Sequence, residues 1–166
     1  MIQYQLLGGT QRDMSISGLV QRAQVHGGGP APFLSPGGGQ TMVGQGQSSV
    51  INFGAAAHRT VAIPLLTCAG VILTSTDPNA AAQAVVYHAT AGDIPNGMIA
   101  LLHAAIGAPP LASLLAVYAT PKPWDANYNT DALKLQAYGI PANRVVYIEQ
   151  IPASTFGINS HGQVGC

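Results

Sequence analysis

Charged side chains are scarce in this sequence of 166 residues. Lysine, arginine, aspartate and glutamate make up 7% of it, and the net charge is zero with neutral histidines, whereas a typical soluble domain carries about 25% charged residues. Without a basic patch, neither nucleic acid nor an anionic membrane surface is expected as a partner. Because charge also keeps copies of a protein apart, the shortage predicts limited solubility and some self-association.

Cysteine is almost as scarce. The two cysteines, Cys68 and Cys166, are far apart in the sequence, which excludes a disulfide framework and a zinc site and leaves only a single long-range bridge open. The sequence also lacks a phosphate-binding Gly-x-x-x-x-Gly-Lys motif and a dinucleotide-binding glycine fingerprint. We therefore expect no metal and no cofactor.

Neither a secretory leader nor a membrane span is expected. The first ten residues contain no basic region followed by an apolar stretch. Residues 98–119 form a largely apolar stretch about as long as the ~20 residues that a membrane-spanning helix needs, but Pro109 and Pro110 interrupt it. Consecutive prolines remove backbone donors and force the preceding residue out of the helical conformation. This segment is therefore predicted to form a helix over 98–106, with Leu101 and Leu102 on its apolar stripe, and a buried strand over 111–118.

Hydrophobic residues make up 48% of the chain, enough for one folded domain over residues 1–166. Glycine and proline concentrate in residues 27–46, which predicts a long loop, and residues 47–166 are expected to form the globular core. The alternation in residues 84–89 predicts a strand with Val86 and His88 on one face and Tyr87 on the other. Thr130 and Gly139 are the expected caps of a helix. Further strands are predicted at 50–53, 59–63 and 144–149, with a hairpin over 155–158 and 163–165.

These elements alternate without a strict strand–helix–strand repeat. The expected fold class is therefore α+β, a β-sandwich or mixed layered sheet with flanking helices.

Cys68 and His88 are the pair of residues with chemical interest. A thiol is a strong nucleophile only as the thiolate, and a neighbouring imidazole can accept its proton. Twenty positions and a predicted Asp77-Pro78 turn separate the two residues, so two antiparallel segments could bring them together. The simpler interpretation of Cys68, which lies among leucine, valine and isoleucine, is a small buried hydrophobic residue.

A series of short motifs follows Thr67 in a fixed order. A Thr-Cys-Ala-Gly stretch precedes an apolar segment, and an Asp-Pro turn and a strand ending in histidine follow. A long helix that ends in Gly-Ile-Pro comes next, then a further strand, and then a Ser-Thr-Phe-Gly stretch before the closing hairpin. This order, over residues 67–165, resembles the chemoreceptor glutamine deamidases, and the cysteine-to-histidine unit is similar to the catalytic domain of cytotoxic necrotizing factor and related toxin deamidases. The resemblance implies their layered α+β fold, with Cys68 as nucleophile and His88 as base.

The departures from the family pattern concern the third catalytic group. Leu66 and Thr67 replace the family's Gly-Ser, and its upstream threonine falls on Ala62. Thr60 or Thr67 is therefore expected to supply that hydroxyl. The group that holds the imidazole is expected to be a backbone carbonyl, Thr60 or Thr67, with Asp93 less favoured, and the backbone N–H of Cys68 is expected to contribute to the oxyanion site.

The resemblance thus implies a cysteine-dependent protein glutamine deamidase, whose partner is a protein bearing the target glutamine. The expected location is the cytoplasm of the producing bacterium or, for an effector or toxin, a target cell reached by export without a classical signal. Two alternatives stay open. One is a catalytically inactive binding module of the same fold, because the approach to the cysteine is altered. The other is a papain-like thiol protease or transglutaminase, because an amine can also resolve a thioester.

Overall fold

The computed structural model describes eleven segments of the chain, which together form two β-sheets and a layer of helices. These segments are residues 3–6, 12–15, 24–25, 40–53, 60–64, 67–90, 93–120, 126–141, 144–149, 155–160 and 162–165. Each sheet contains six described strands. The expectation of an α+β fold with a mixed sheet is confirmed at this level.

The first sheet has the strand order β1-β10-β9-β7-β8-β5. The pairs β1–β10 and β10–β9 are parallel, and the other three pairs are antiparallel. Its strands are β1 (Gln3–Leu6), β5 (Ser48–Ile51), β7 (Ala69–Ser75), β8 (Ala84–Ala89), β9 (Leu114–Ala119) and β10 (Val145–Glu149). All residues of β7, β8 and β9 are buried, so both faces of this sheet are covered.

The second sheet has the order β3-β2-β12-β11-β6-β4 and is antiparallel except for the parallel pair β4–β6. Its strands are β2 (Arg12–Ser15), β3 (Gln24–Val25), β4 (Gln40–Met42), β6 (Thr60–Pro64), β11 (Thr155–Asn159) and β12 (Gln163–Gly165). The predicted C-terminal hairpin is confirmed, because β11 and β12 pair directly.

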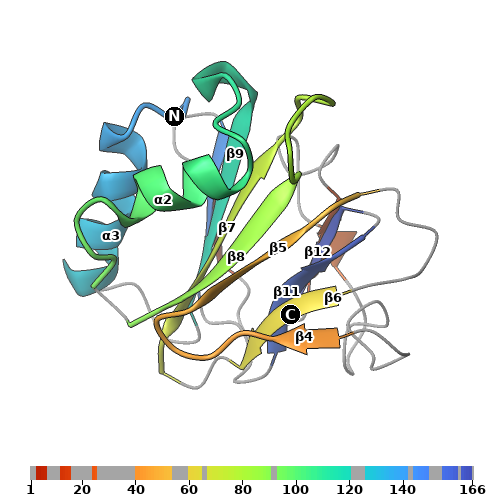
Figure 1. The fold of residues 1–166 in the computed structure, drawn as a ribbon. Coiled ribbons are helices and arrows are strands. Elements are labelled where there is room, and N and C mark those ends of the chain that lie inside the picture. Colours follow the sequence, from red (N-terminus) through yellow and green to blue (C-terminus); the bar gives the residue numbers. More distant parts are fainter. Residues whose placement is uncertain are drawn as a thin grey trace.

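The first sheet lies between the second sheet and two helices (Figure 1). The helices are α2 (Met98–Ala105) and α3 (Ala126–Ala137). In β8, Ala84 and Val86 pack in one core cluster with residues of the second sheet, whereas Val85 and Tyr87 pack in another with residues of the helices. The predicted alternation of β8 is therefore confirmed, and it places His88 on the face toward the second sheet.

Two details of the predicted helices are wrong. Leu102 is buried as predicted, but Leu101 is 65% exposed and Ile99 faces the core in its place. The segment is apolar on nearly every side, so its pattern fixed the helix but not the buried stripe. The late helix begins at Ala126, so Thr130 lies inside it and is not the N-cap.

The end of that helix is as predicted. Gly139 has a φ of 107°, the left-handed conformation that closes a helix, and Pro141 follows it. The predicted strand over 111–118 is also confirmed, except that the short 3₁₀ helix η2 (Leu111–Ser113) precedes β9. No helix in the described segments is both long and apolar enough to cross a membrane.

The predicted loop over residues 27–46 needs correction at its end. Residues 40–42 form β4, and Val43, which follows it, is buried. Glycine content alone suggested a loop, but the parallel pairing with β6 outweighs it. Residues 27–39 lie outside the described residues.

Candidate active site

A crossover between the two sheets forms one wall of the candidate site. β4 lies at one edge of the second sheet and β5 at one edge of the first, so residues 43–47 carry the chain from one sheet to the other. The N–H of Val43 donates to the carbonyl of Ala62 at 2.8 Å, and the N–H of Gln47 donates to the carbonyl of Gly44 at 2.9 Å. The crossover is therefore fixed to β6 and closed by its own turn.

The crossover holds His88 by three hydrogen bonds. The His88 N–H donates to the Gln47 carbonyl at 3.0 Å, and the N–H of Gly46 donates to the His88 carbonyl at 2.8 Å. The imidazole Nδ1 lies 3.0 Å from the carbonyl oxygen of Val43. A carbonyl oxygen can only accept, so Nδ1 carries a proton, and the neutral ring has its lone pair on Nε2.

The Nε2 atom of His88 is the basic atom of the site. His88 is 6% exposed, and the described residues provide no hydrogen-bond partner for Nε2. Buried polar atoms in folded proteins are nearly always paired, and an unpaired one requires a reason. An imidazole whose tautomer is fixed by a carbonyl and whose second nitrogen is available has the arrangement of a general base.

Cys68 lies at the same end of the first sheet as His88. It directly precedes β7, in which Ala69 pairs with Ala89 and Gly70 pairs with His88. Cys68 itself lies in a bend outside this ladder, so the register places it at the His88 end of β7 without assigning its side chain to a face.

The Cys68 thiol is free and half-buried. No hydrogen bond joins it to the His88 imidazole, both of which the structure describes. Because Cys68 precedes the strand, its side chain is not held by the packing of the ladder residues. The fold thus brings the two predicted residues to one place without a direct contact, and Cys166 lies outside the described residues.

Thr60 is the first residue of β6 in the second sheet. β6 runs from Thr60 to Pro64, and the chain reaches Cys68 after leaving the Pro64 end. Four residues of strand, at ~3.3 Å each, separate the two ends by about 13 Å. Thr60 also alternates with Val61, which faces the space between the sheets, so the Thr60 side chain points to the outer face. The bond to His88 Nδ1 comes from Val43, and the expected role of the Thr60 hydroxyl stays a prediction.

The other predicted partners lie nearer the site. Thr67 is exposed and adjacent to Cys68 in the chain, but the hydrogen bond to His88 Nδ1 comes from Val43. Asp93 is exposed and forms a β-bridge with Thr90. Burial raises the pKa of Tyr87, and the Asp93 charge raises it further, so the Asp93 carboxylate acts on the helix-facing side of β8 rather than on His88.

The group that orients the imidazole is thus a backbone carbonyl, as one of the sequence alternatives held. Its residue, Val43, could not be named beforehand, because a main-chain oxygen leaves no side-chain signal and the glycine-rich surroundings suggested a loop. In the described segments, no group of three or more histidine, cysteine or acidic side chains lies together.

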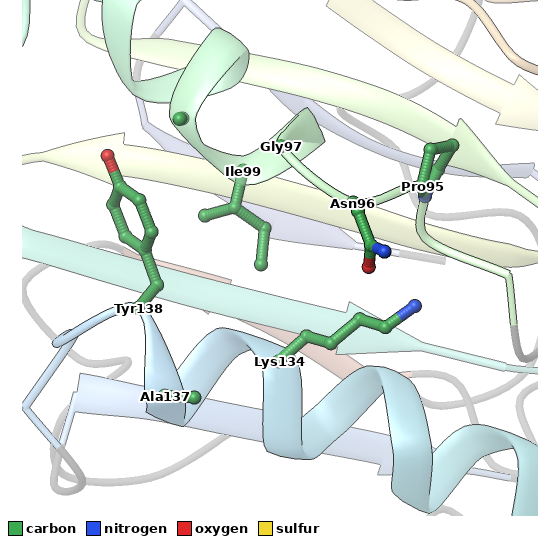
Figure 2. Close-up of a pocket in the computed structure, with 8 residues that line it drawn as sticks. Pro95, Asn96, Gly97, Ile99, Lys134, Ala137 and Tyr138 are labelled. Atoms are coloured by element: carbon green, nitrogen blue, oxygen red, sulfur yellow. The ribbon is translucent and has the colours of Figure 1, made fainter.

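A separate cavity of about 300 Å³ lies between α2 and α3. Figure 2 shows Ile99 and Asn96 on one side of it, facing Lys134 on α3 and Tyr138 directly after that helix. The Lys134 ammonium donates to the carbonyl of Ile94. No cysteine or histidine lines this cavity, and it lies in the helix layer, on the opposite side of the first sheet from the His88 face.

Comparisons with known proteins leave the family open: no family model matches the chain, and neither the curated proteins nor the solved structures contain a significant match.

Proposed function

We propose that this chain is a cysteine-dependent protein glutamine deamidase. The observation that carries the proposal is the hydrogen bond between His88 Nδ1 and the Val43 carbonyl, which leaves Nε2 as a buried, available base at the end of the sheet where the free Cys68 lies. The order of motifs shared with the chemoreceptor and toxin deamidases supports the choice of an amide substrate.

The proposed reaction converts a glutamine side chain into glutamate in two steps. Nε2 of His88 takes the Cys68 proton, and the thiolate attacks the carboxamide carbon. The carbon–nitrogen bond then breaks, and ammonia leaves with the proton from the imidazole. Water activated by the same nitrogen hydrolyses the thioester, which releases glutamate and restores the thiol.

The geometry makes two demands on this reaction. The Cys68 side chain must rotate toward Nε2, which its place before the ladder allows, and catalytic hydrogen bonds often form only once substrate is bound. The oxyanion needs donors, and the Cys68 N–H is the candidate, because it precedes the first ladder pair of β7. Loss of one such donor typically costs roughly 3–4 kcal/mol of transition-state stabilisation.

An unbiased search for Gln→Glu changes tests the proposal. Cells expressing the wild-type chain are compared with cells expressing Cys68→Ala or His88→Ala, and His103→Ala serves as the matched histidine control. We expect conversions of partner-protein glutamines that need both Cys68 and His88 and persist in His103→Ala. Identical proteomes in all four would refute the proposal.

The same experiment separates the rival chemistries. A transglutaminase would leave amines attached to glutamine, and a protease would leave new chain ends. If either product formed only with Cys68 present, the deamidase assignment would be wrong, but Cys68 would still be the nucleophile. An effector role is supported by the resemblance to toxin deamidases, and conversions found only in proteins of a target cell would establish it.

A further inference from the structure

A glutamine of this chain lies at the end of the sheet where Cys68 and His88 are found. The Gln45 side-chain amide donates to the Thr90 hydroxyl at 2.7 Å. Gln45 belongs to the crossover that holds His88, and glycines stand on both sides of it. Gly46 has a φ of 76°, so the backbone turns sharply just after the glutamine.

Thr90 connects this amide to Cys68 through the strand register. Ala69 and Ala89 form the last pair of the β7–β8 ladder. Cys68 precedes Ala69 and Thr90 follows Ala89, so both residues extend from the same pair and lie at the same end of the two strands. The Gln45 carboxamide is therefore held at Thr90, which leaves β8 at the end of the ladder where the chain passes from Cys68 into β7.

We infer that Gln45 is a substrate of Cys68 in its own chain and is converted to glutamate there. The inference rests on the proposed function, of which it names one substrate. The Cys68 sulfur forms a bond to the Gln45 carboxamide carbon, the carbon–nitrogen bond breaks, and ammonia leaves with the proton that His88 took from the thiol. One water then cleaves the thioester, so that the net change is amide plus water to carboxylate plus ammonium.

Neighbouring glutamines provide internal controls. The Gln47 side chain lies over Gly44, where an added Cβ would be 2.9 Å from Gln47 Oε1. Gln83 lies at the opposite end of β8, where its Oε1 accepts from the N–H of Phe53 at 3.1 Å. Among these three glutamines, only Gln45 has its amide bonded to Thr90, at the end of the β7–β8 ladder that Cys68 precedes.

Peptide mass spectrometry of the purified full-length chain tests the inference. Wild type, Cys68→Ala and His88→Ala are incubated at several protein concentrations, and the Gln→Glu mass change is located by fragmentation. We expect progressive conversion of Gln45 in wild type only, at a rate independent of protein concentration, while Gln47 and Gln83 stay unchanged. Thr90→Val removes the hydroxyl that holds the amide, so conversion of Gln45 should slow by about 10-fold or more, a loss typical of misplaced reactants.

Each other outcome has a definite meaning. Equal conversion in wild type and Cys68→Ala would be spontaneous and would overturn the inference. An unchanged Gln45 in wild type would also overturn it, and the proposed function would survive if alkylation of Cys68 still depended on His88. If Cys68 alkylation did not depend on His88 either, both the inference and the proposed function would be refuted. A conversion rate that rises with protein concentration would show that the reaction occurs between copies and not within one chain.

Discussion

The carbonyl oxygen of Val43 lies 3.0 Å from Nδ1 of His88, and the two residues come from different sheets. Val43 follows β4 at the edge of the second sheet, and His88 belongs to β8 in the first. The tautomer of the imidazole therefore depends on how the two sheets are joined at this edge. Any change that shifts the crossover should therefore disturb the position and tautomer of the imidazole.

The first prediction concerns the dependence of Cys68 on His88. In a Cys166→Ser background, Cys68 should be alkylated by iodoacetamide on the order of 10²-fold faster in the wild-type sequence than in His88→Ala, because a positioned base typically contributes 10²–10⁴-fold. His103→Ala is the control, since His103 is bonded to Tyr138 and Pro109 in the helix layer. Equal slow labelling in all three proteins would favour the inactive binding module.

The second prediction compares alanine at a left-handed glycine of the crossover with alanine at a left-handed glycine elsewhere. Gly46 and Gly97 have φ values of 76° and 81°, and an added Cβ at either would meet nothing within 4 Å. Alanine at either position should therefore cost a similar free energy of unfolding, roughly 1–2 kcal/mol from the left-handed backbone. Urea unfolding of the two variants measures this cost.

Only one member of this pair should affect the site. The Gly46 N–H donates to the His88 carbonyl, so Gly46→Ala should also slow Cys68 alkylation, whereas Gly97→Ala should leave it unchanged. Equal alkylation rates in the two variants would show that the crossover does not control the imidazole.

Some features of the fold depend only on residues that are close together in the chain. The faces of β8 follow from alternation alone, and the turn after β7 follows from Asp77, whose carboxylate accepts from the Asn79 N–H at 2.9 Å. Both features depend on residues close in the chain, so the sequence predicts them. The proximity of Cys68 and His88 is also of this kind, because one hairpin joins them.

Features set by distant segments could not be predicted in the same way. Thr130 looked like a helix start because it precedes Asp131, a residue suited to a first turn. The Asp131 carboxylate is instead buried, where it accepts from the Ile94 N–H and the Tyr118 hydroxyl, both at 2.9 Å. The role of Val43 likewise depends on β6, which follows it in the chain and fixes it in space.

The third prediction concerns the contact between the sheets under the site. A Cβ added at Gly70 would lie 2.5 Å from both Ile63 Cδ1 and Phe156 Cδ1. Gly70→Ala should therefore destabilise the fold by about 1–3 kcal/mol, the usual cost of overpacking. Ile63→Val removes Cδ1, so the double variant should recover part of this loss in urea unfolding. A double variant whose destabilisation equals the sum of the single ones would contradict the proposed clash.

The fourth prediction concerns the buried pair beneath the helices. Tyr118→Phe removes one donor to the Asp131 carboxylate, which is fully buried. A hydrogen bond to a charged group typically contributes about 1.5–3 kcal/mol, so thermal and urea unfolding should both show a loss of this size. In a double-mutant cycle with Asp131→Asn, the coupling between the two positions should reach about 0.5 kcal/mol or more. Strict additivity would show that the hydroxyl does not support the carboxylate.

The fifth prediction concerns stability at alkaline pH. Burial raises the pKa of Tyr147 above its ordinary 10.0, although the hydrogen bond from Gln136 lowers it in part, and burial likewise raises the pKa of Tyr87. The unfolded chain therefore loses these protons at a lower pH than the folded chain. Their contribution to stability is complete below pH 10 and falls as the pH rises through the folded-state pKa values.

Tyr147→Phe isolates one of the two groups. A tyrosine with a raised pKa titrates between about pH 9 and about pH 11.5. Over this range the urea midpoint of the variant should fall less steeply than that of wild type, because phenylalanine has no proton to lose. Tyr87→Phe should reduce the remaining slope, and the two effects should add. If the slope of Tyr147→Phe matched that of wild type, the alkaline loss would have to come from other groups, and the burial of the Tyr147 hydroxyl would not be its cause.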